Sequence, residues 1–118
     1  MNILAFNTST EKFSLAIFKK NKIVYCYSKV LKNNYSKYLI PIIKDSLKKS
    51  QTKIKEISTI SVSLGPGSFT GIRLGIAAAK GLAMSNKINI LGFSNMDLII
   101  NSLNKIKENK ILLLIKSK

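Results

Sequence analysis

Two short segments carry residue types that could bind a phosphate group. The first is a hydroxyl-rich turn, made of Asn7, Thr8, Ser9 and Thr10, that follows an apolar run. The second is a loop, made of Gly65, Pro66, Gly67 and Ser68, that leads from an expected strand into an expected helix. Backbone N–H groups and the helix dipole favour an anion at such a helix start. The two segments therefore predict, as one alternative, a small ATPase or phosphotransferase.

The same segments lack the residues that phosphate chemistry usually requires. No Gly-Lys-Ser/Thr sequence closes the loop as in the Walker pattern, and the glycines lack the spacing of the dinucleotide fingerprint. Metal-assisted phosphate chemistry needs a carboxylate in the turn, where residue 7 is asparagine. We therefore interpret the first segment as a degenerate phosphate turn.

The remaining reactive side chains are few and scattered. The acidic residues are Glu11, Asp45, Glu56, Asp97 and Glu108, and they form no pair with the spacing of a general acid and base. The chain has no histidine, and its single cysteine, Cys26, lies in an alternating run typical of a strand. This inventory excludes ordinary zinc and iron sites. We expect no catalytic residue, metal or cofactor, which favours a noncatalytic binding subunit.

A row of small residues at every fourth position marks the expected helix after the loop. The row consists of Gly71, Gly75, Ala79 and Ala83. Glycine inside a helix costs about 0.8 to 1 kcal/mol relative to alanine, so the row must serve a close approach by another backbone. That backbone could belong to the protein's own sheet or to a helix of a partner. Membrane dimerisation would need about 20 apolar residues, and Arg73 and Lys80 interrupt the stretch.

Hydrophobic periodicity predicts the elements that position these segments. The expected strands are 3–7, 13–19, 22–30, 57–64, 88–93 and 111–115. Three helices are expected: the first begins at Ser36, the second spans 70–84 and the third spans 94–109. In the first helix Leu39, Ile43 and Leu47 recur at four-residue intervals, and Pro41 either lies in its first turn or bends it. Three antiparallel strands followed by alternating helices and strands predict an α/β fold. The expected architecture is a ribonuclease-H-like mixed sheet with helices on both faces.

Composition sets the remaining limits. A length of 118 residues predicts one domain, and the chain has neither a long uncharged apolar run nor a signal-peptide start, so we expect a cytoplasmic protein without membrane contact. The net charge of +15 is compatible with a tRNA-binding module, but 19 of the 20 basic residues are lysine rather than arginine. Isoleucine, lysine and asparagine fill 48 of 118 positions, which is typical of an A+T-rich genome. We therefore expect tRNA to be bound only weakly or indirectly.

Two stretches of the sequence resemble a known family. Residues 1–17 are similar to the family opening I-L-A-I-D-T-S/T-T-E-x-x-S-V-A-L, and residues 64–83 are similar to its signature G-P-G-S-F-T-G-x-R-x-G-x-x-x-A-K/Q-G-L-A. The family is the bacterial tRNA threonylcarbamoyladenosine biosynthesis family TsaB, also called YeaZ, a paralogue of the catalytic subunit TsaD. The resemblance covers essentially the whole chain. It departs at Asn7, where family members generally carry aspartate.

The resemblance implies a two-lobed protein of the actin-like ATPase superfamily, of which residues 1–118 would be the N-terminal lobe with the C-terminal lobe absent. It implies a noncatalytic subunit that supports TsaD in the threonylcarbamoylation of adenosine 37, in tRNAs that read codons beginning with A. Implied partners are TsaD in a heterodimer, the ATPase subunit TsaE, and in one alternative a second copy of the chain. The implied interface lies on the helices that begin at Ser36 and Thr70. Its residues would be Leu39, Ile43, Leu47, Gly71, Ile72, Gly75 and Ala79, with the small-residue row as the seam.

Overall fold

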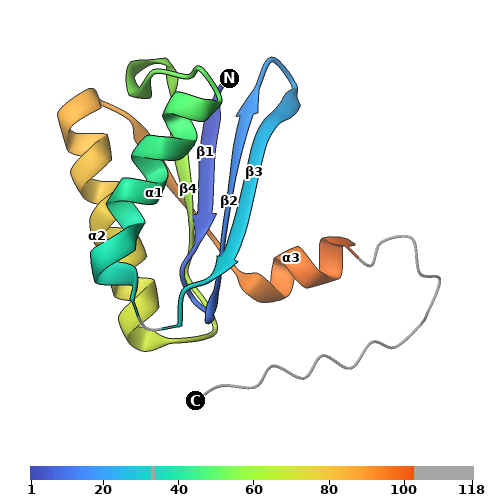
Figure 1. Cartoon of the computed structure of the whole chain (residues 1–118). Coiled ribbons are helices and arrows are strands. Elements are labelled where there is room, and N and C mark those ends of the chain that lie inside the picture. Colours follow the sequence, from blue (N-terminus) through green and yellow to red (C-terminus); the bar gives the residue numbers. More distant parts are fainter. Residues whose placement is uncertain (33, 103–118) are drawn as a thin grey trace.

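A computed structural model describes residues 1–32 and 34–102 of the chain (Figure 1). The elements in chain order are β1 (Ile3–Asn7), β2 (Lys12–Lys19), β3 (Lys22–Val30), α1 (Tyr35–Lys49), the short 3₁₀ helix η1 (Ile54–Glu56), β4 (Thr59–Ser63), α2 (Phe69–Asn86), β5 (Asn89–Phe93) and α3 (Asn95–Ser102). The strands form one sheet in the order β3-β2-β1-β4-β5.

The sheet is mixed, as the sequence predicts. Strands β1, β2 and β3 pair antiparallel, whereas β4 pairs parallel with β1, and β5 pairs parallel with β4. Lys20 and Asn21 connect β2 to β3 with φ values of 52° and 63°, which suits the two-residue turns that join antiparallel strands. The α/β class and the ribonuclease-H-like strand order are therefore confirmed.

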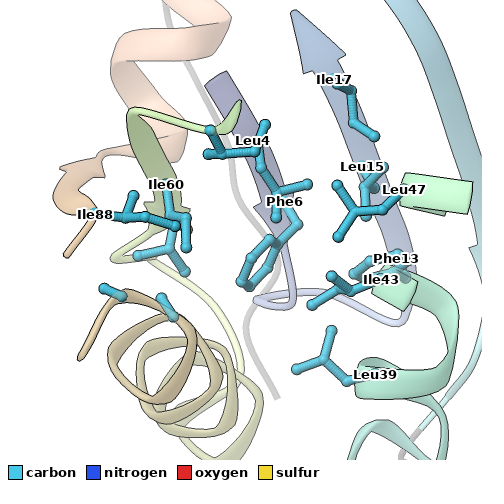
Figure 2. Close-up of a cluster of buried hydrophobic side chains, with 14 of the residues drawn as sticks. Leu4, Phe6, Phe13, Leu15, Ile17, Leu39, Ile43, Leu47, Ile60 and Ile88 are labelled. Atoms are coloured by element: carbon cyan, nitrogen blue, oxygen red, sulfur yellow. The ribbon is translucent and has the colours of Figure 1, made fainter. Parts of the chain in front are cut away.

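Helices α1 and α2 lie side by side on one face of the sheet (Figure 1). The alternating pattern of the strands places every second side chain on that face. Buried residues from the strands include Leu4, Phe6, Phe13, Leu15, Ile17, Ile60 and Val62. Figure 2 shows the apolar stripe of α1, formed by Leu39, Ile43 and Leu47, directed toward these strand residues. The core thus lies between the helix pair and this face of the sheet.

Several predicted boundaries differ from the structure. Pro41 is the seventh residue of α1 and therefore lies beyond the first turn, so the first of the two alternatives for it is wrong. Strand β4 begins at Thr59 rather than at residue 57, because the 3₁₀ turn of η1 ends just before Ile57. The expected helix 94–109 is described as far as Ser102, and the expected strand 111–115 lies outside the described residues.

Candidate functional site

The two predicted phosphate segments meet at one edge of the sheet. Both follow strands that run parallel, β1 and β4, and the carboxyl ends of parallel strands share an edge. The backbone N–H of Ser68 donates a hydrogen bond to the carbonyl oxygen of Ser9 at 2.6 Å. A Cβ atom built at Gly67 would lie 2.2 Å from the same oxygen, so only glycine fits there. The structure therefore packs the loop directly against the turn.

Asn95, the first residue of α3, joins three segments at this edge. Its side-chain nitrogen Nδ2 donates to Ser9 Oγ at 2.6 Å and to the carbonyl oxygen of Pro66 at 2.9 Å. Its Oδ1 accepts from Asn7 Nδ2 at 2.9 Å and from Ser63 Oγ at 2.8 Å. The residue is only 8% exposed, so these bonds satisfy a buried amide completely. Asn95 thus ties together the ends of β1 and β4 and the loop.

The sequence analysis did not identify Asn95. One signal was available, because Asn95 follows the third of three parallel strands and its side chain therefore had to lie near the ends of the other two.

The side chains of the predicted phosphate turn bond within the chain. Asn7 Oδ1 accepts from the backbone N–H of Ser9 at 2.9 Å and from Ser9 Oγ at 2.5 Å. Thr8 Oγ1 donates to the carbonyl oxygen of Gly71 at 2.6 Å, and Thr10 Oγ1 donates to the carbonyl oxygen of Lys12 at 2.9 Å. The turn is therefore closed by its own hydrogen bonds and by those of Asn95.

The motif loop caps helix α2. Ser68 is the N-cap residue, and its Oγ accepts from the backbone N–H of Gly71 at 3.1 Å, as serine commonly does at this position. Gly65 has a φ of 95°, a left-handed conformation that favours glycine, and its peptide bond to Pro66 is cis. Two N–H groups that would face an anion at the helix start, those of Ser68 and Gly71, are bonded to Ser9 and to Ser68 instead.

The small-residue row of α2 faces the protein's own sheet. All four residues, Gly71, Gly75, Ala79 and Ala83, are buried. A Cβ atom at Gly71 would lie 2.1 Å from the carbonyl oxygen of Thr8, and one at Gly75 would lie 2.3 Å from Thr8 Oγ1. The alternative in which the row serves the protein's own sheet is confirmed. The prediction that Gly71, Gly75 and Ala79 form a seam for a foreign helix is wrong, because Thr8 already occupies the space beside both glycines and Ala79 is fully buried.

The predicted interface residues of α1 are also buried. Leu39, Ile43 and Leu47 are 4%, 1% and 9% exposed, because the apolar stripe of α1 is what covers the sheet. A partner cannot reach these side chains on the folded chain, so this part of the predicted interface is corrected as well. Ile72 is half-buried, and a Cβ atom built at Gly65 would lie 2.7 Å from its Cδ1.

The opposite side of α2 is open to solvent. Eight residues of α2 are exposed, among them the charged Lys80, and we call five of them the outward face: Phe69, Arg73, Ala77, Gly81 and Met84. Phe69 and Met84 are 72% and 83% exposed, and the Arg73 guanidinium lies 4.8 Å from the centre of the Phe69 ring. A Cβ atom built at Gly81 would have no described neighbour within 4 Å. Glycine at this position is therefore not required by any described contact within the chain.

Tyr35 connects the start of α1 to the turn. Its hydroxyl donates to the carbonyl oxygen of Thr10, and its ring packs edge-on against Phe13 with the centroids 6.0 Å apart. Burial raises the pKa of the Tyr35 hydroxyl to about 12. The phenol is therefore held in its neutral, hydrogen-bond-donating form at ordinary pH.

The described residues also bear on metal binding and on membrane insertion. Within residues 1–32 and 34–102, no three side chains of the metal-binding types His, Cys, Asp and Glu gather in one place. None of the described helices has the length and apolar character needed to cross a bilayer.

Comparison with known proteins gives consistent matches. The family model "TsaD: tRNA N6-adenosine threonylcarbamoyltransferase" matches residues 28–117. The "tRNA threonylcarbamoyladenosine biosynthesis protein TsaB" of Buchnera aphidicola subsp. Schizaphis graminum is 35% identical over 117 residues, which are 98% of this chain and 55% of that protein. The protein of the same name from Escherichia coli is 33% identical over 96 residues, 81% of this chain and 41% of that protein.

A solved structure agrees with these matches. The structure titled "YeaZ from Pseudomonas aeruginosa" is similar with a TM-score of 0.81 and 25% sequence identity. The similarity covers 90% of this chain and 49% of that one. The chain therefore spans about half the length of the relatives that it matches.

Proposed function

Because the chain belongs to the TsaB and TsaD family of tRNA threonylcarbamoyladenosine biosynthesis proteins, we propose that it is a noncatalytic subunit of this pathway. In this proposal the chain binds the catalytic threonylcarbamoyltransferase TsaD and supports it in the modification of adenosine 37 of tRNA. Residues 1–118 correspond to the N-terminal lobe of the longer relatives. The protein acts in the cytoplasm.

The hydrogen bonds within the predicted phosphate turn are the observation that supports a noncatalytic role. A nucleotide bound at this edge would need hydroxyl and N–H donors from the turn and the loop. These donors are already used within the chain. Ser9 Oγ donates to Asn7, Asn7 Nδ2 donates to Asn95, and the backbone N–H of Ser68 donates to the carbonyl oxygen of Ser9. No carboxylate stands in the turn to hold a metal ion, because residue 7 is asparagine.

The outward face of α2 is the proposed docking surface for the catalytic subunit. Its residues follow one another at intervals of four, four, four and three, so they share one side of the helix. Ala77 and Gly81 leave room for a second helix to approach closely, and the exposed Phe69 and Met84 supply apolar area at either end. Ile72, which is half-buried, stays part of the proposed interface. A second copy of this chain is the alternative occupant.

Two further partners follow from the same proposal. The ATPase subunit TsaE joins the complex, and tRNA contacts this chain weakly or through the catalytic subunit. The many lysines would then give the chain only a salt-dependent, sequence-independent attraction to RNA.

Calorimetry and copurification test the proposal together. The chain alone should show no heat of binding with ATP and magnesium, and coexpression with TsaD of the same organism should yield a heterodimer. Binding of ATP by the chain alone would favour the ATPase alternative. A second test measures threonylcarbamoyladenosine in tRNA from cells that lack their own TsaB and express this chain with TsaD; the modification should return, and its absence would contradict the proposal.

A further inference from the structure

Lysines gather at the end of the molecule where β1 begins. The hairpin of β2 and β3 lies there, because Phe18 stands opposite Ile3, the first residue of β1. The 3₁₀ helix η1 lies there too, since Asn2 Nδ2 donates to the carbonyl oxygen of Glu56 at 2.9 Å and Lys19 Nζ lies 2.9 Å from Glu56 Oε2. Figure 1 shows the hairpin, the start of β1 and the last turn of α1 at this same end.

Four segments supply the lysines of this end: the hairpin, the last turn of α1, η1 with the residue before it, and the residue after α2. The last of these belongs here because β4 and β5 start side by side, with Thr59 opposite Asn89. We call the set the basic end; it consists of Lys19, Lys20, Lys22, Lys48, Lys49, Lys53, Lys55 and Lys87.

Acidic residues balance only a small part of this charge. All of these lysines except Lys19 are exposed. Among the described residues, ion pairs engage only two of them, Lys19 with Glu56 and Lys49 with Asp45. The hydrogen bond from Lys19 is the main cause that lowers the pKa of Glu56, and the charge of Lys53 lowers it further. One carboxylate thus serves two lysines, and the basic end keeps a strong positive charge.

Neither base composition nor helix capping explains this gathering. An A+T-rich genome accounts for the number of lysines in the chain, but not for their place in the fold. Cations interact favourably with the carboxyl end of a helix, which explains Lys48 and Lys49 in the last turn of α1. The lysines of the hairpin lie on no helix. The opposite end of the sheet and of α1 holds half as many lysines, namely Lys12, Lys29, Lys32 and Lys37.

We propose that the basic end binds the phosphate backbone of RNA. The inference deepens the proposed function and rests on it, since tRNA is the RNA that the proposed complex modifies. The lysines extend from the hairpin beside β3 to Lys87 beside β5, and five adjacent strands span about 19 Å. A free phosphate would contact only part of this row, whereas an extended polyanion can contact all of it.

The kind of side chain and its placement favour RNA contacts without base recognition. Lysine presents a point charge rather than the planar fork of arginine, so the expected contacts are to phosphates and not to base edges. Amphipathic helices that bind a membrane surface carry their lysines along one polar face. The lysines of the basic end come from separate turns and helix ends instead, which argues for RNA over a lipid surface.

Two matched variants of the full 118-residue chain test the proposal. The basic-end variant carries Lys20→Gln, Lys22→Gln, Lys53→Gln and Lys55→Gln. The control variant carries Lys12→Gln, Lys29→Gln, Lys32→Gln and Lys37→Gln. Each set removes four exposed lysines and includes one at positive φ, Lys20 at 52° and Lys32 at 53°. The variants therefore differ in where charge is lost and not in how much is lost.

Binding of an unmodified tRNA transcript is measured by fluorescence anisotropy between about 50 and 200 mM salt. The basic-end variant should bind at least about tenfold more weakly than the unchanged chain, and its slope of log affinity against log salt should be smaller by about 3. The control variant should stay within about threefold of the unchanged chain. Equal weakening in both variants, or no binding of tRNA by the unchanged chain, overturns the proposal.

Lysine acetylation of the unchanged chain needs no variant and so covers the case in which one fails to fold. Mass spectrometry measures the acetylation rate of each lysine with and without tRNA. Lys20, Lys22, Lys53 and Lys55 should be protected, and the four control lysines should react as before. Equal protection of both sets overturns the proposal. Binding to vesicles that contain an anionic lipid, with no binding to tRNA, also overturns it, because the partner would then be a membrane.

Copurification with TsaD separates this inference from the proposed function. The basic-end variant should still copurify with TsaD, because none of its substitutions lies on the outward face of α2. If this variant loses TsaD, the basic end belongs to that interface and the proposal is wrong. If the unchanged chain binds TsaD but not tRNA, only the RNA surface is refuted and the proposed function stands.

Discussion

The two sides of helix α2 contain the same kinds of small residue under opposite conditions. Gly71 on the inner side meets the carbonyl oxygen of Thr8 so closely that even a methyl group has no room. At Gly81, ten residues further along and on the outer side, a Cβ atom would meet no described atom within 4 Å. A small residue is therefore not by itself a sign of an interface with a partner. What distinguishes the two sides is whether the chain itself fills the space opposite.

Replacing each of the two glycines by alanine tests this comparison with the largest expected effect. Gly71→Ala should lower the free energy of unfolding by about 3 kcal/mol, because the new Cβ forces backbone of β1 or α2 to move. Gly81→Ala should raise it by up to about 1 kcal/mol, the usual gain of alanine over glycine in a helix. Urea denaturation of the two full-length variants measures the difference. Equal changes at the two positions would contradict the described packing of α2.

The hydrogen-bonded turn beside the small-residue row of α2 gives the next prediction. Asn95→Ala removes four hydrogen bonds and leaves Asn7 and Ser63 without their buried partner, so stability should fall by about 2 kcal/mol. The control is Asn101→Ala on the same helix, where residue 101 is exposed and little change is expected. Thermal unfolding compares the two variants. A loss at Asn95 no larger than at Asn101 would show that the network does not hold the turn.

A buried and an exposed tyrosine of α1 extend the comparison to pH. The pKa of Tyr35 is raised to about 12 in the folded chain, whereas an unfolded tyrosine titrates near 10. Between these values the unfolded chain binds fewer protons, so stability falls as pH rises. The contribution of Tyr35 to this loss should be about 1 kcal/mol at pH 11.

Urea denaturation at pH 8 and pH 11 isolates that contribution. Tyr35→Phe should reduce the loss of stability between the two pH values. Tyr38→Phe, which removes a hydroxyl from a residue that is 40% exposed, should leave the loss as it is. The same pH dependence in both variants would argue against a buried, neutral Tyr35.

The smallest effect is expected at an exposed ion pair. Lys19 Nζ lies 2.9 Å from Glu56 Oε2, and this hydrogen bond lowers the pKa of Glu56. Because the folded pKa lies below the unfolded value, the pair stabilises the chain above the unfolded pKa of glutamate and stops doing so as pH falls through the folded value. Glu56→Gln should slightly flatten the stability profile between pH 5 and pH 3. A large change would mean that this surface pair matters more than its exposure indicates.

The sequence predicted the fold well because periodicity reports local geometry. The short apolar run 3–7, the alternation in 13–19 and the four-residue spacing of Leu39, Ile43 and Leu47 predicted a strand, a strand and a helix at the places where the structure has them. The sequence pattern could not show what lies opposite Gly71 and Gly75, because periodicity identifies a helix face but not the element that packs against it. The partner therefore had to be found in three dimensions.

The closed turn was even less predictable. Asn7, Ser63 and Asn95 are far apart in the sequence, and only the pairing of three parallel strands brings their side chains together. A row of small side chains on the other face of the sheet arises in the same way, from strand pairing. Ala5, Ala16 and Cys26 are unremarkable in the sequence, and they form a row only because the strand registers align them.

The affinity of TsaD for the outward face of α2 tests the central claim most directly. The dissociation constant is measured by calorimetry for the unchanged chain, for Gly81→Leu and for the control Gly81→Ala. Gly81→Leu should weaken binding at least about tenfold, equivalent to about 1.4 kcal/mol, while its unfolding free energy stays near that of Gly81→Ala. Unchanged affinity in Gly81→Leu would contradict the claim that a partner helix packs against this side of α2.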